Sequence, residues 1–266
     1  MPTAIVLAAH GSRHPGAMAA LAAFGARLSR ELPDTRVEIA RTVGRKHGGR
    51  HDFGGARRVP DILAALAADG VGRVAVQSLH VVPGEEYHDM LAGLGRFLEG
   101  NAAGLTVSVG APLLASLADV DRVAEAVLAS LPGKRSPAEA VVVMGHGAPP
   151  PGAGFYDVLA EKLGRLDALA HFGTMPREKG APCPDIGRIR DTLVRHGVRA
   201  AWLLPFFTEA GAHACCDLAG DGPDSWRGIL EAAGIRCAPL LCGLIEQPAM
   251  AALWREHLQT ALSRLP

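Results

Sequence analysis

The 266-residue sequence predicts an α/β protein made of two similar domains, each a parallel β-sheet flanked by helices. Short apolar runs of strand length alternate with longer stretches of helical periodicity, the pattern of parallel strands joined by helices. The pattern also occurs twice: residues 4–9 lead into His10-Gly11, and residues 140–145 lead into His146-Gly147. The two histidines are 136 positions apart, about half the chain, so we interpret the chain as a duplicated domain.

The first half carries clear helix boundaries. Ala, Leu and Phe recur at helical spacing before Pro33, and Pro60 opens the next helix, where its missing N–H costs no hydrogen bond. The elements expected in this half are, in order, strand 5–9, helix 17–31, strand 36–42, helix 61–69, strand 73–79, helix 87–98 and strand 105–110.

The second half repeats this order, which predicts right-handed crossovers between parallel strands. Its expected elements are strand 140–144, helix 153–165, strand 167–172, helix 185–196, strand 199–206, helix 224–233 and strand 236–241. A helix at 119–131 links the halves, and a helix at 247–262 is its counterpart at the end. We therefore expect domains at residues 1–125 and 126–266, with the C-terminal helix packing across the boundary as an alternative.

Composition excludes several classes of function. The net charge is zero, with 27 basic and 27 acidic residues, whereas a nucleic-acid or membrane-surface protein needs a basic face. No apolar run approaches the ~20 residues of a membrane span, and the first run is interpreted as a strand rather than a signal peptide. The five cysteines are odd in number and form no CxxC pair, which favours free thiols and a cytoplasmic location.

The candidate site lies at the strand ends. Ligands of open parallel sheets bind beyond the carboxyl ends of the strands. His10 and His146 directly follow the first strand of each half, while Glu86 and His213 follow the third strand of each half. If the halves face each other, these four residues converge on one cleft. A lone histidine at a strand end is more often structural. Two histidines at duplicated strand ends, His146 and His213, favour a metal site, because neutral imidazole is a common ligand of transition metals.

For three other features, namely His80, a set of acidic residues and a basic loop, the sequence leaves two interpretations open. His80 either lines the cleft or is a core imidazole, and Glu85 is more simply a solvated neighbour of Glu86. Three acidic residues either draw cations toward His213 or solvate a loop: Asp217, Asp221 and Asp224. The stretch 41–58 is a basic, glycine-rich loop that either binds a polyanionic small ligand or is a solvated surface. Its central cations are Arg45, Lys46 and Arg50.

Several segments closely resemble the sirohydrochlorin cobaltochelatases, which are class II chelatases. The matching segments are Gln77-Ser78-Leu79-His80, Gly84-Glu85-Glu86-Tyr87, Met144-Gly145-His146-Gly147-Ala148, Leu204-Pro205, Ala210-Gly211-Ala212-His213-Ala214, Asp221-Gly222-Pro223-Asp224-Ser225-Trp226 and Ala232-Ala233-Gly234-Ile235. The resemblance implies two similar α/β domains with an active-site cleft between them. It also implies insertion of a divalent metal into a tetrapyrrole without ATP.

The resemblance assigns roles to individual residues. It implies that His146, His213 and Glu86 bind the metal, and that His146 and Glu86 also accept protons. We expect His10, with Arg45, Lys46 and Arg50, to contact the tetrapyrrole. Pro176 stands where the family usually has a metal-binding Glu, so Glu86, Glu178 and His10 all remain candidates for the third ligand.

The expected reaction is therefore insertion of Co²⁺ into sirohydrochlorin in cobalamin biosynthesis, with Fe²⁺ and sirohaem as the alternative. No prosthetic group is expected, because the metal is a substrate. The partners are the polycarboxylate tetrapyrrole and the metal, not nucleic acid or membrane, and the oligomeric state stays open. A carrier of tetrapyrrole or cobalt is the first alternative. A metal-assisted hydrolase is the second, and it lacks the third closely spaced ligand of catalytic zinc sites.

Overall fold

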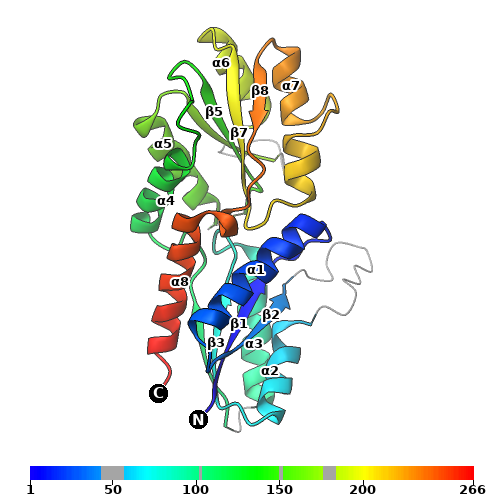
Figure 1. Cartoon of the computed structure of the whole chain (residues 1–266), viewed down its shortest axis with the longest axis vertical. Helices are drawn as coiled ribbons and strands as arrows, with labels where there is room; N and C mark the ends of the chain where they lie inside the picture. The colour runs from blue at the N-terminus through cyan, green and yellow to red at the C-terminus, as the bar shows by residue number, and fades with distance from the viewer. Residues whose placement is uncertain (43–56, 102–103, 150–151, 176–183) are drawn as a thin grey trace. The chain divides into compact units, whose positions relative to one another are not determined.

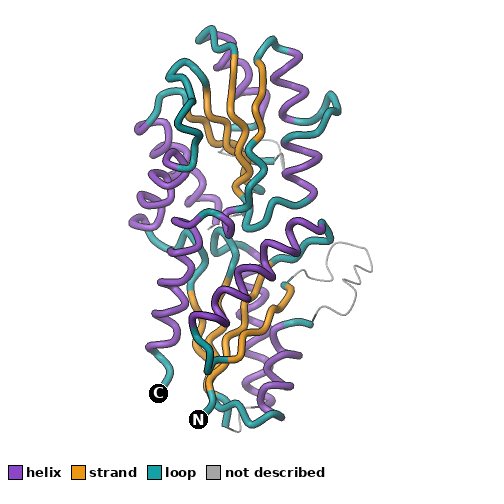
Figure 2. The backbone as a smooth tube through the Cα atoms, in the orientation of Figure 1, coloured by secondary structure: helices purple, strands orange, loops and turns teal. Residues whose placement is uncertain are grey.

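The computed structural model describes residues 1–42, 57–101, 104–149, 152–175 and 184–266 (Figure 1). The chain divides into two compact units. Unit 1 comprises Met1–Ala115 together with Ala251–Pro266, and unit 2 comprises Ser116–Met250. Each unit contains one four-stranded parallel sheet with helices packed against it, as Figure 2 shows by colour. The predicted fold class is confirmed.

Unit 1 has its strands in the order β2-β1-β3-β4. Its elements are β1 (Thr3–Ala9), α1 (Pro15–Glu31), β2 (Arg36–Arg41), α2 (Val59–Ala68), β3 (Arg73–Ser78), α3 (Glu85–Asn101), β4 (Thr106–Gly110) and nearly all of α8 (Pro248–Ser263). Helices cover both faces of this sheet. Ala4, Val6 and Ala8 of β1 form a buried cluster with α2 and α3, while Leu7, on the alternate face, packs at Gly25 of α1. Double coverage explains why β1 is a continuous apolar run from Ala4 to Ala9.

Unit 2 repeats the arrangement with the order β6-β5-β7-β8. Its elements are α4 (Leu117–Ala129), β5 (Ala140–Gly145), α5 (Gly152–Leu166), β6 (Ala170–Thr174), α6 (Ile186–Arg195), β7 (Ala200–Phe206), the π-helix η1 (His213–Leu218), α7 (Trp226–Ala232), β8 (Arg236–Pro239) and the 3₁₀ turn η2 (Leu244–Glu246). Val142 and Met144 of β5 pack with α6 and α7, while Tyr156 of α5 stacks on Phe172 of β6.

The duplication is confirmed by strand order and by register. Ala9, the last residue of β1, pairs with Arg41, and Gly145, the last residue of β5, pairs with Thr174. In both units, the residue that follows the neighbouring strand donates its backbone N–H to the carbonyl of that last residue. Thr42 N–H donates to Ala9 O at 2.9 Å, and Met175 N–H donates to Gly145 O at 3.1 Å. The expected helices and strands are all present, with ends that differ by a few residues, whereas η1 and η2 were not expected.

The division into units differs from the boundary expected at residue 125, which falls inside α4. The whole of α4 belongs to unit 2, where Asp121 pairs with Lys162 of α5 at 2.7 Å. Most of α8 belongs to unit 1, where Arg255 pairs with Glu31 of α1 at 2.8 Å. Tertiary packing of these two helices sets the division. None of the helices in the described ranges is both long and apolar enough to cross a membrane.

Candidate functional site

Equivalent backbone turns place His10 and His146. Each histidine directly follows the last residue of the first strand in its unit, at the carboxyl edge of the sheet. Each is followed by a glycine with positive φ, +105° at Gly11 and +80° at Gly147. Other L-residues rarely adopt this conformation, so the glycines allow the chain to turn sharply and leave each histidine at the strand end.

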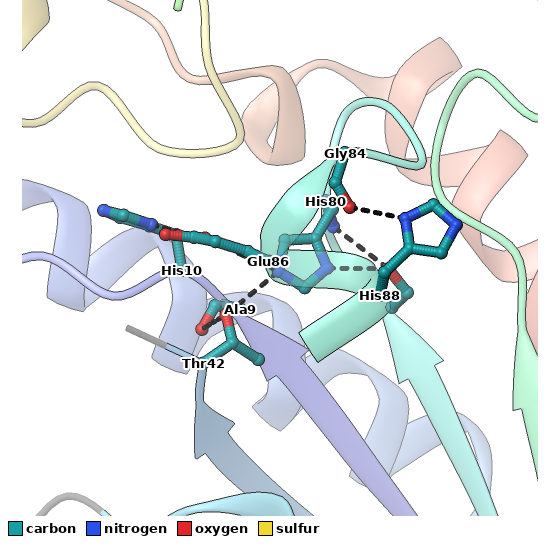
Figure 3. A network of polar contacts seen from close by, with 8 residues as sticks. Ala9, His10, Thr42, His80, Gly84, Glu86 and His88 are labelled. Carbon is teal, nitrogen blue, oxygen red and sulfur yellow. Dashed lines mark hydrogen bonds and ion pairs between the residues drawn. The ribbon is translucent and has the colours of Figure 1, made fainter. Parts of the chain in front are cut away.

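In unit 1, His10 lies against Glu86. His10 Nδ1 is 2.7 Å from Glu86 Oε2, although the two residues are 76 positions apart in the sequence (Figure 3). Glu86 is the second residue of α3. A carboxylate is favoured there because the first turn of a helix carries a partial positive charge. Two residues that the sequence placed at the same sheet edge are thus in direct contact.

His80 lies next to Glu86 and is only 8% exposed. Its Nδ1 is 2.9 Å from Ser78 Oγ, and its Nε2 is 2.9 Å from Thr42 Oγ1 and 3.8 Å from Glu86 Oε2. Burial lowers the pKa of His80 to about 4, with Glu86 opposing this shift and His10 adding to it. The imidazole is therefore neutral near pH 7. His80 is thus a buried imidazole, as the second interpretation from the sequence has it, and it is also a neighbour of Glu86.

In unit 2, His146 lies against His213. Their ring centroids are 5.3 Å apart, and the ring of Phe207 lies 6.5 Å from His146 and 6.0 Å from His213. His213 is the first residue of η1, and π-helical turns occur often at functional sites. Two imidazoles beside an apolar ring form a site suited to a transition metal, which binds neutral imidazole nitrogen.

Asp217 orients His213. Its Oδ2 lies 2.5 Å from His213 Nδ1, four residues earlier in η1. A carboxylate at Nδ1 holds the proton on that nitrogen and leaves the lone pair of the neutral ring on Nε2, as in many metal-binding histidines. Asp221 instead pairs with Arg227 at 2.9 Å. The four-residue spacing of His213 and Asp217 is a helical signal, but the loop-like sequence around it did not predict a helix.

The two sites occupy equivalent places but have different chemistry. His10 is equivalent to His146, and Glu86 to His213. A third equivalent position differs as well, with His80 next to the pair in unit 1 and Phe207 next to the pair in unit 2. These two residues are 127 positions apart, the same offset as Glu86 and His213. The site of unit 1 is thus polar and carries a carboxylate, whereas the site of unit 2 has two imidazoles and an apolar neighbour.

The structure places the predicted residues in two pairs, His10 with Glu86 and His146 with His213, each within one unit. Within the described ranges, no three His, Cys, Asp or Glu side chains are gathered closely enough to hold a metal ion. Five residues considered in the sequence lie outside the described residues: Arg45, Lys46, Arg50, Pro176 and Glu178.

Comparison with solved structures identifies the fold. SirB from Bacillus subtilis with Fe³⁺ superposes with a TM-score of 0.68 at 16% identity, covering 99% of this chain and 98% of that one. The sirohydrochlorin chelatase SirB from Bacillus subtilis subspecies spizizenii in complex with cobalt gives a TM-score of 0.65 at 16% identity, covering 99% and 97%. The duplicated sheets therefore form a chelatase fold.

Sequence comparison identifies the family. The profile of the cobalt chelatase (CbiK) family matches residues 3–263, and the chain belongs to this family. It is 38% identical over 266 residues to the sirohydrochlorin cobaltochelatase CbiKC of Nitratidesulfovibrio vulgaris, covering 98% of this chain and 91% of the relative. It is 36% identical over 203 residues to the sirohydrochlorin cobaltochelatase of Salmonella typhimurium, covering 76% and 73%. The resemblance noted in the sequence is confirmed.

Proposed function

We propose that the protein is a sirohydrochlorin cobaltochelatase that inserts Co²⁺ into sirohydrochlorin without ATP. The observation that carries this proposal is the His146–His213 pair with its Asp217 partner, in a chain that belongs to the cobalt chelatase family. Co²⁺ is a substrate, and Fe²⁺ is the alternative because imidazole and carboxylate ligands bind both metals.

The proposed roles follow from the chemistry of insertion, which removes two protons from pyrrole nitrogens and transfers the metal from protein to ring. His146 and His213 bind the incoming metal through neutral imidazole nitrogen, with Asp217 orienting His213. Glu86 is the proposed third ligand and a proton acceptor. Its carboxylate can accept a proton that a pyrrole nitrogen releases, and His146 accepts a proton once the metal leaves it.

Binding of the tetrapyrrole involves other residues. His10 contacts Glu86 and is proposed to lie beside the macrocycle. Arg45, Lys46 and Arg50, outside the described residues, are proposed to bind the substrate carboxylates through charge-assisted hydrogen bonds. We also propose a cytoplasmic location, because a reducing compartment suits the free thiols of Cys216, Cys237 and Cys242.

The test is anaerobic insertion kinetics with sirohydrochlorin and Co²⁺, Fe²⁺ or Ni²⁺ in parallel, followed by the change in the absorption spectrum. We expect saturable turnover with Co²⁺, well above the rate of the reaction without protein. Stoichiometric binding of sirohydrochlorin with no turnover would instead identify a carrier. Faster turnover with Fe²⁺ than with Co²⁺ would assign the protein to sirohaem synthesis.

A further inference from the structure

A series of buried and partly buried hydrogen bonds joins the ends of three strands in unit 1. Ala9 ends β1, Thr42 follows β2, and Ser78 ends β3. Thr42 Oγ1 donates to the Ala9 carbonyl at 3.1 Å and lies 2.9 Å from His80 Nε2 (Figure 3). On the other side of the ring, Ser78 Oγ lies 2.9 Å from His80 Nδ1. The imidazole of His80 is therefore held on both sides by groups at or next to strand ends.

The number of hydrogens on each group shows which atom donates in each of these hydrogen bonds. A carbonyl oxygen only accepts, so the single hydroxyl hydrogen of Thr42 points to Ala9. Thr42 Oγ1 must then accept from His80, which places the ring hydrogen on Nε2. Nδ1 carries the lone pair and accepts from the Ser78 hydroxyl, whose oxygen also accepts the backbone N–H of His80 at 3.3 Å.

The Nε2 atom of His80, whose hydrogen is donated to Thr42, also lies near Glu86. Nε2 is 3.8 Å from Glu86 Oε2, the same oxygen that lies 2.7 Å from His10 Nδ1. A separation of 3.8 Å is too long for a hydrogen bond, so this contact acts through the N–H dipole and not through a shared proton. We propose that His80 is a positioning residue: it aligns the Glu86 carboxylate from the buried side, opposite His10, for its part in metal insertion.

The duplicated unit shows that this polar arrangement is not required by the fold. The positions equivalent to His80 and Thr42 in unit 2 are Phe207 and Met175, which occupy the same strand ends. An aromatic ring and a thioether are accommodated there without a hydrogen-bonded chain. The polar pair therefore occurs in the unit that carries Glu86, as expected if it serves the carboxylate.

This inference rests on the proposed function and is tested in the same assay with three variants. The amide nitrogen of Gln in His80→Gln reaches the place of Nε2, whereas that of Asn in His80→Asn reaches the place of Nδ1. His80→Phe copies the duplicated position. We expect His80→Asn and His80→Phe to lower kcat about tenfold or more with KM for sirohydrochlorin unchanged, and His80→Gln to stay within about threefold of wild type.

Packing alone predicts a different pattern, since it would treat Gln and Asn alike. Equal kcat values for these two variants, wild-type kcat in all three, or a loss confined to KM would overturn the inference. Far-UV circular dichroism and melting temperature are measured for each variant, and if His80→Asn does not fold, His80→Phe takes its place as the variant without an N–H. No turnover by the wild type would refute the proposed function itself, whereas an active wild type with an unresponsive position 80 refutes only the role of His80.

Discussion

Single residues differ at positions that the fold makes equivalent. The strand end that carries His10 in unit 1 carries His146 in unit 2, but Glu86 of unit 1 is replaced by His213. Their supporting contacts differ accordingly: His10 lies against a carboxylate, and His213 is held by Asp217 within η1. Duplication followed by substitution of a few side chains is enough to give one unit a carboxylate site and the other a pair of imidazoles.

His146 is the first residue to test. We expect His146→Ala to remove more than nine-tenths of kcat/KM for Co²⁺ insertion, a loss above ~1.4 kcal/mol, because it deletes a proposed ligand and proton acceptor. The far-UV spectrum should match that of the wild type, since His146 is only half-buried at a strand end. A folded variant that keeps more than a tenth of kcat/KM would assign the central role to another residue.

Asp217 is expected to affect the metal and not the tetrapyrrole. Asp217→Asn should weaken Co²⁺ binding by about 10- to 100-fold, because an oriented histidine loses its carboxylate partner. The matched control is Asp221→Asn, four residues later, whose carboxylate pairs with Arg227 and not with a histidine. Titration calorimetry of the protein without tetrapyrrole measures both affinities. Equal effects of the two substitutions would mean that only the local negative charge matters.

At the scale of elements, the turn after β5 depends on a glycine. Gly147→Ala should lower the free energy of unfolding by about 1–2 kcal/mol, because Ala must then adopt the positive φ found there. Gly164→Ala, at an exposed position of α5 with open space around the added methyl group, should instead raise it by about 0.5–1 kcal/mol. Urea titrations followed by circular dichroism compare the two variants, and the same sign for both would contradict the backbone argument.

The start of β7 carries a pH-dependent contact. Trp202 Nε1 donates to Glu139 Oε2 at 2.9 Å, and this bond, with the Ser136 backbone N–H, lowers the pKa of Glu139. A carboxyl group with a lowered pKa stabilises the fold above its unfolded pKa of about 4.3. That contribution disappears as the pH falls through the lower folded value. Trp202→Phe should therefore lose less stability than the wild type between pH 5 and pH 3.

Urea unfolding followed by circular dichroism at several pH values between 3 and 7 measures this difference. The control is Glu139→Gln, which removes the titrating group itself and should flatten the same part of the pH profile. Parallel profiles for the wild type and both variants would show that other carboxyl groups dominate the acid response of unit 2.

At the scale of the whole molecule, neutral net charge makes the local basic segment informative. Replacing Arg45, Lys46 and Arg50 together with Ala should raise KM for sirohydrochlorin more than it lowers kcat, as expected when contacts of equal strength in ground and transition state are lost. The control replaces Arg27 and Arg30, exposed cations of α1, and should leave KM unchanged. An unchanged KM in the triple variant would make the segment an ordinary solvated surface.

The sequence determined the fold class, the duplication and the identity of the candidate side chains. Alternating apolar runs and helical periodicity are local signals, and the repeat alone located His10, His146, Glu86 and His213 at equivalent strand ends. The family followed from the same segments, because they resemble those of the sirohydrochlorin cobaltochelatases.

Only the tertiary structure decided which side chains touch. The contacts of His10 with Glu86 and of His80 with Thr42 join residues 76 and 38 positions apart, and they depend on strand register and on where each helix begins. The assignment of α4 and α8 to opposite units also depends on helix packing that no local pattern encodes. Periodicity reports which face of an element is buried, whereas the distance between two side chains is set by the packing of several elements at once.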